Sequence, residues 1–137
     1  MHRILCDQRG LNWPKMDPSE VQRRYDQAII HLEFAMDLCE IQRRGGRYYL
    51  HEHPHSAASW HEQCTERMLT SPDCVYVRAD QCMFNLRLGP EDVTSLKPTG
   101  IMTNSMEVAA LLDVRCSNDH PHRRIFSSSD LSQRAAI

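Results

Sequence analysis

The sequence predicts one mixed α/β domain in which helices cover an at least partly parallel sheet. Its length of 137 residues, 41% of them apolar, fits a single domain with a modest core. A long segment of helical periodicity comes first, and short strand-like and helix-like segments alternate after it, which favours parallel pairing. We expect an N-terminal extension at 1–16, the α/β domain at 17–122 and a flexible polar tail at 123–137.

The first helix is predicted from Asp17 to about Arg44. Asp17 can cap it, Pro18 suits the first helical position, and Glu20 stands three residues after the cap. The pair Gly45-Gly46 supplies a left-handed end. Apolar residues recur at helical spacing and define one buried face: Val21, Tyr25, Ala28, Ile29, Leu32, Ala35, Met36 and Cys39.

The remaining elements are short and follow in the order strand, helix, strand, strand, helix. We expect them at 47–52, 57–69, 74–77, 100–103 and 106–114. Asn104 or Ser105 can cap the last helix, and Gly89-Pro90 marks a loop.

Charge and cysteine content exclude several classes of protein. A formal net charge of −2 gives no general attraction to nucleic acid, so any such contact must be local. The N-terminus has no apolar signal segment, and the longest apolar run, 108–112, is too short to span a membrane. We therefore expect the six cysteines to be reduced and the protein to be intracellular, in nucleus or cytoplasm.

Cys116, His120 and His122 form a candidate metal site with the spacing Cys-x3-His-x-His. A thiolate and two imidazoles suit zinc, but a structural zinc site normally has four ligands. Cys82, His53 or Cys74 could supply the fourth ligand if the fold brings it near. The alternative is a solvated polar loop without metal.

His51 and His53 form a second candidate, because alternation along a strand places both on one face and Glu52 on the other. They can be metal ligands, or polar groups at a strand end that bond to loops or water. Cys39 and Cys64 are expected in the core. Cys82 follows a strand, where it either packs or lies at a cleft.

Arg43, Arg44 and Arg47 flank the double glycine. Favourable interaction with the helix dipole is sufficient to explain this basic patch, and phosphate contact is the functional alternative. No glycine-rich nucleotide loop, nucleophile elbow or Cys-x-x-Cys pair occurs. No motif therefore supports nucleotide binding, acyl transfer or a thioredoxin-like function.

Several ordered motifs together resemble a domain embedded in retroelement-type polyproteins of dinoflagellate-like genomes. That domain is similar to the later half of phage-type DNA cytosine methyltransferases, and the resemblance covers residues 11–122. The motifs are Lys15-Met16-Asp17-Pro18, Gly46-Arg47-Tyr48-Tyr49-Leu50-His51-Glu52-His53-Pro54, Ala58-Ser59-Trp60, Asp80-Gln81-Cys82-Met83-Phe84, Lys97-Pro98-Thr99, Met102-Thr103-Asn104 and Cys116 with His120 and His122.

The resemblance implies a partial Rossmann-like (methyltransferase-like) fold with an incomplete, mostly parallel sheet. It implies that Glu52 is the position that contacts a flipped base, and that Arg47, Lys97 and Thr99 contribute to substrate binding. His53 replaces the family's asparagine, and Asn85 stands where a glycine is expected.

The chain lacks the Pro-Cys nucleophile and the S-adenosylmethionine loop, and Cys6 has neither the proline nor the spacing. The resemblance therefore implies a truncated or degenerate domain that is inactive alone, with S-adenosylmethionine bound only in a full-length form. Its expected partners are nucleic acid, the missing half of a polyprotein, or a second copy through self-association. The alternative from another class is a small zinc-stabilised module that binds nucleic acid or protein.

Overall fold

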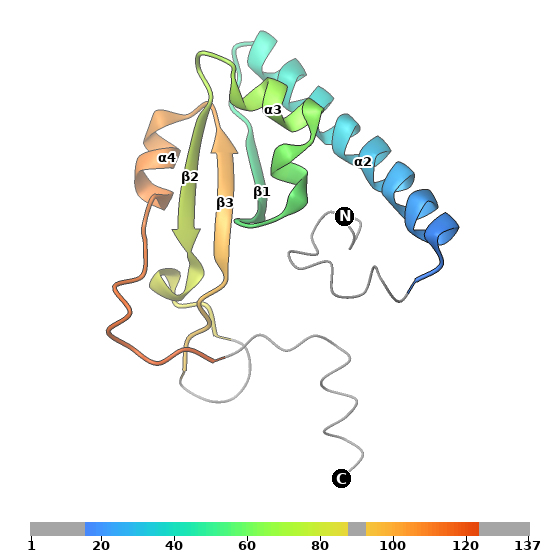
Figure 1. Ribbon diagram of the computed structural model, residues 1–137. Helices are drawn as coiled ribbons and strands as arrows, with labels where there is room; N and C mark the ends of the chain where they lie inside the picture. Colours follow the sequence, from blue (N-terminus) through green and yellow to red (C-terminus); the bar gives the residue numbers. More distant parts are fainter. Residues whose placement is uncertain (1–15, 88–92, 124–137) are drawn as a thin grey trace.

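The computed structural model describes residues 16–87 and 93–123 (Figure 1). Nearly all of the expected extension at 1–16 and tail at 123–137, and most of the Gly89-Pro90 loop region, lie outside these ranges. The elements in chain order are α2 (Pro18–Arg44), β1 (Leu50–Pro54), η2 (Ala58–His61), α3 (Gln63–Leu69), β2 (Val75–Asp80), η3 (Gln81–Phe84), β3 (Pro98–Thr103) and α4 (Met106–Leu112). None of the helices in the described part of the chain is both long and apolar enough to cross a membrane.

The sheet is antiparallel, so the expected mostly parallel, Rossmann-like sheet is wrong. Its three strands have the order β1-β3-β2, and β3 runs opposite to both neighbours. Leu50 of β1 and Val75 of β2 both pair with Thr103, so β1 and β2 do point in the same direction. Because β3 lies between these two strands and is antiparallel to both, no parallel strands are paired, and β1, α3 and β2 form a split β-α-β unit.

Helix α2 follows the sequence prediction closely. The Asp17 carboxylate accepts hydrogen bonds from the amides of Ser19 at 2.9 Å and Glu20 at 3.3 Å, which satisfies two free donors at the helix start. Gly46 takes a left-handed φ of 67° just beyond the helix end, as the double glycine predicted.

Helices lie on both faces of the sheet, with α2 and α3 on one side and α4 on the other (Figure 1). On one face, buried residues of α2 such as Leu32 and Met36 pack in a cluster with Trp60 of η2 and Met102 of β3. On the other face, residues of β2 and β3 pack with Ala109 of α4. The structure is therefore a three-layer arrangement of helices, sheet and one short helix.

Several boundaries differ from the sequence prediction; the strand expected at 100–103, for example, begins at Pro98, and the helix expected at 106–114 ends at Leu112. The strand expected at 47–52 begins only at Leu50, because the Asn104 side chain takes the place of a strand partner: it accepts from the Tyr49 amide at 2.9 Å and donates to the Arg47 carbonyl at 3.0 Å. The helix expected at 57–69 is broken at Glu62, whose ψ of 142° is extended. The strand expected at 74–77 continues to Asp80.

Candidate metal centre

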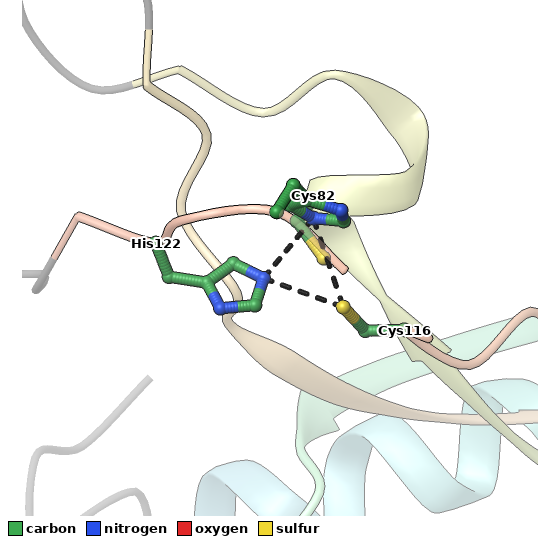
Figure 2. Close-up of side chains that lie close together, drawn as sticks. Cys82, Cys116 and His122 are labelled. Atoms are coloured by element: carbon green, nitrogen blue, oxygen red, sulfur yellow. Dashed lines mark hydrogen bonds between the residues drawn. The ribbon is translucent and has the colours of Figure 1, made fainter. Parts of the chain in front are cut away.

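Four side chains that could bind a metal ion meet beyond the end of β2. Cys82 lies in η3 directly after that strand, and Cys116, His120 and His122 lie in the segment that returns to the sheet after α4. Figure 2 shows the side chains of Cys82, Cys116 and His122 pointing toward one another. Of the three candidates for a fourth ligand, the fold brings Cys82 into the group, while neither His53 nor Cys74 belongs to it.

Three separations within this group are close to those between the ligands of a tetrahedral ion, while the group as a whole is wider. All four ligand atoms lie within 4.8 Å of one another. The Cys116 Sγ is 3.3 Å from the Nε2 of His122 and 3.7 Å from that of His120, and the two Nε2 atoms are 3.1 Å apart. Ideal zinc–ligand bond lengths in a tetrahedron require ligand separations of about 3.3–3.8 Å.

A buried carboxylate anchors the backbone on which Cys116 stands. Asp80, the last residue of β2, is 2% exposed and accepts a hydrogen bond from the Cys116 amide at 2.9 Å. Its own amide donates to the Val114 carbonyl at 2.9 Å, and Arg78 Nε donates to its carboxylate at 2.9 Å. Burial raises the pKa of Asp80, but the hydrogen bonds from Arg78 and the Cys116 amide outweigh it and lower that pKa overall.

Two further contacts prepare the ligand atoms themselves. The Asn118 amide donates a hydrogen bond to the Cys116 sulfur at 3.2 Å, which helps to fix the position of that sulfur. His120 Nδ1 lies 2.8 Å from the Asp119 carboxylate. A proton held on Nδ1 by that carboxylate leaves Nε2 free to coordinate, which is the usual arrangement when a carboxylate hydrogen-bonds a histidine that binds a metal.

Cys82 is the most enclosed member of the group, at 6% exposure. Burial, together with the neighbouring Cys116 thiol, raises the pKa of Cys82 to about 11. Without a metal it is therefore a protonated thiol at neutral pH, and it is not an activated nucleophile. A bound cation would displace that proton and make the residue a ligand.

His51 and His53 share one face of β1, as the strand pattern predicted, but they are not part of the group that could hold a metal ion. Both are buried, with ring centroids 5.2 Å apart and 5.5 and 6.1 Å from Trp60. His53 Nδ1 also hydrogen-bonds the Ser59 hydroxyl. Burial lowers the pKa of both imidazoles, so in this structure they are neutral core groups.

The opposite face of the sheet carries a hollow of about 570 Å³, and Glu52 and Thr99 line it. Lys97 Nζ is 4.0 Å from the Glu52 carboxylate, so three of the residues singled out by resemblance lie together. Gln81 and Phe84 also line the hollow. Both residues come from η3, a four-residue element that is too short to be predicted from its sequence pattern.

The other predicted residues lie elsewhere. Arg47 does not line the hollow, and its guanidinium donates to Gln42 at 2.5 Å. Arg43 and Arg44 both pair with Glu40, at 2.7 Å each, which offsets the charge of the predicted basic patch. Cys39 is buried in the core as expected, and Cys64 packs against that core while partly exposed.

No protein-family model matches this chain, and neither the curated proteins nor the solved structures contain a significant match to it.

Proposed function

We propose that the chain is a small binding module whose fold is stabilised by one structural zinc ion, held by Cys82, Cys116, His120 and His122. The observation that carries this proposal is the convergence of two sulfur and two nitrogen donors, from two distant parts of the chain, within 4.8 Å. Such a meeting of soft and borderline ligands is typical of a closed zinc site.

The donor set favours zinc over the other common ions. Magnesium and calcium prefer oxygen ligands, and the group offers sulfur and imidazole nitrogen. Four protein ligands complete a tetrahedron, so no coordination position is left for a water or a substrate. The ion would therefore act as a cross-link, and the module is proposed to be a binder with no catalytic metal.

The cross-link would lie in a part of the chain with little regular structure. After α4 the chain makes no further helix up to Arg123, and its backbone joins the rest through the Arg123 amide, which donates to Thr94 at 2.8 Å, and through the Asp80 contacts. Tying His120 and His122 to Cys82 would fix this segment against the end of β2. Because the unfolded chain has no preformed site, the binding free energy would add to the folding free energy.

The test measures how much zinc stabilises the protein. The purified full chain is stripped with a chelator, and its thermal unfolding is followed by circular dichroism with and without added zinc. We expect near-stoichiometric zinc in the purified protein and a large fall in Tm on stripping, since ligand at about a thousand times its Kd stabilises by about 4 kcal/mol.

Matched variants assign the effect to the site. Cys82→Ser should abolish the zinc-dependent rise in Tm, whatever its effect on the metal-free protein, whereas Cys64→Ser should leave that rise unchanged because Cys64 lies outside the group. A wild-type Tm that does not change when zinc is added, or a zinc-dependent rise in Tm that is equal in both variants, would overturn the proposal.

A second candidate function is recognition of a nucleic-acid base in the hollow beside Glu52. It is supported by the carboxylate of Glu52, the Gln81 amide that donates to Thr99 at 2.8 Å, and the Phe84 ring, 46% exposed and available for stacking. The resemblance to the later half of cytosine methyltransferases suggests the same position for Glu52. The antiparallel sheet, however, does not form the crevice at the carboxyl ends of parallel strands in which Rossmann-like folds bind ligands.

This candidate predicts binding of a base without methyl transfer, because no cysteine that could attack the base is among the described residues that line the hollow. Titration with a short single-stranded, cytosine-containing oligonucleotide tests it by fluorescence anisotropy. Glu52→Gln should weaken binding by at least about tenfold, since a lost charge-assisted pair costs 1.4 kcal/mol or more. Glu66→Gln, an exposed carboxylate on α3, is the control. Equal affinity of both variants would exclude the hollow as the site.

A further inference from the structure

Helix α2 carries a second apolar stripe that faces away from the core. Ile30, Phe34, Leu38 and Ile41 are 65%, 62%, 47% and 57% exposed. Their spacings of four, four and three residues place them along one face of the helix. The sequence contained this signal, but the stripe predicted from it was the buried one alone.

The outer stripe lies nearly opposite the buried one. Leu32, at 0% exposure, is two positions from Phe34, which corresponds to roughly 200° around the helix axis. Side chains on such opposite faces cannot share one core. Four large apolar residues in a row on the surface of a small domain are typical of an interaction site.

An acidic groove runs along one flank of this stripe. It has a volume of about 540 Å³ between α2 and α3, and Ile30 lines it together with four carboxylates, Asp26, Glu33, Asp37 and Glu62, and a single cation. Tyr25 donates to Glu62 at 2.9 Å, and Gln22 donates to Asp26 at 2.7 Å. Over the described ranges, Glu33 and Asp37 form no salt bridge.

We propose that this face of α2 docks a basic amphipathic helix of a partner protein. Apolar side chains of that helix would contact Ile30, Phe34 and Leu38, and lysine or arginine side chains on its flank would lie in the groove against Glu33 and Asp37. Helix-in-groove recognition uses this combination of apolar anchors and a charged flank, and complementary charge speeds association and selects the partner.

The charges argue against a second copy of this chain as the occupant. In an antiparallel pair of α2 helices, the acidic flank of one helix would face the same flank of the other, and Glu33 and Asp37 would repel their counterparts. The surface also lies on α2, apart from the ligands that follow β2 and α4. This proposed docking surface is therefore separate from the proposed zinc site, and its binding does not depend on the metal.

The test uses a synthetic helical peptide of leucine and lysine as the probe, and a leucine and glutamate peptide of the same pattern for comparison. Binding to the full, zinc-saturated chain is measured by fluorescence anisotropy at low and high salt. We expect the lysine peptide to bind with an affinity that falls with salt, and the glutamate peptide to bind at least about tenfold more weakly.

Variants locate the contact. Phe34→Ser and Asp37→Lys should each weaken binding of the lysine peptide by at least about tenfold, and both lie on the exposed face, so the unfolding temperature should be nearly unchanged. Phe84→Ser is the matched control, because Phe84 is 46% exposed but lies in η3 and lines the hollow beside Glu52. Should Phe34→Ser fail to fold, Leu38→Ser tests the same stripe.

Equal binding of the two peptides, or full binding by Phe34→Ser, would overturn the proposal. Sedimentation equilibrium adds one more outcome: a wild-type dimer that Phe34→Ser converts to monomer would assign the stripe to a second copy and would also overturn it.

Discussion

Acid should destabilise the fold through His53, whose imidazole is buried neutral. The residue is 3% exposed, and burial, with the nearby His51 ring, lowers its pKa from 6.5 to about 4. Between these two values the unfolded chain binds more protons than the folded one, so stability is complete above about pH 6.5 and is lost as the pH falls toward about 4. At pH 5 the loss from this group is about 2 kcal/mol relative to pH 7.

Urea denaturation at about pH 7 and about pH 5 measures this loss in zinc-saturated wild-type protein, in His53→Gln and in His31→Gln. His31 is exposed on α2 and serves as a matched control. Because the candidate metal centre is unchanged in all three proteins, the difference between them isolates His53. The acid-dependent loss should shrink by about 2 kcal/mol in His53→Gln alone. An equal loss in wild type and His53→Gln would refute the reasoning.

Three further predictions concern stability, each measured by urea denaturation. Leu32→Ala removes a fully buried side chain and should cost about 3–5 kcal/mol, whereas Ile30→Ala on the exposed face should change stability by less than about 0.5 kcal/mol; similar costs would contradict the assignment of the two faces. Gly100→Ala should cost about 1–3 kcal/mol, because the added methyl would overlap the aromatic side chains packed on β3; a neutral effect would show that those side chains move aside. Asp80→Asn should cost about 1–3 kcal/mol and weaken zinc binding, because it removes the charge that holds the Cys116 amide; unchanged zinc affinity would show that the anchor does not position that ligand.

Local signals in the sequence predicted the helices and strands better than their arrangement. The cap at Asp17 and the stripe through Leu32 predicted α2, since both depend on residues a few positions apart. The pairing of β3 with both β1 and β2 depends on contacts between distant segments, so alternation of helices and strands did not reveal it.

The candidate metal centre was likewise predicted only in part. The spacing of Cys116, His120 and His122 identified three candidate ligands, because one short loop can bring them together. The fourth ligand lay far earlier in the chain, and the sequence offered no means to choose Cys82 over Cys74 or His53. Cys82 belongs to the group because β2 extends to Asp80 and places Cys82 next to the loop that carries Cys116, His120 and His122.

X-ray absorption at the zinc K-edge of the purified protein tests the metal centre most directly. One zinc ion with two sulfur neighbours at about 2.3 Å and two nitrogen neighbours at about 2.0–2.1 Å is the predicted result. A shell of nitrogen and oxygen without sulfur, or a protein that retains no zinc, would contradict a site built from Cys82, Cys116 and the two histidines.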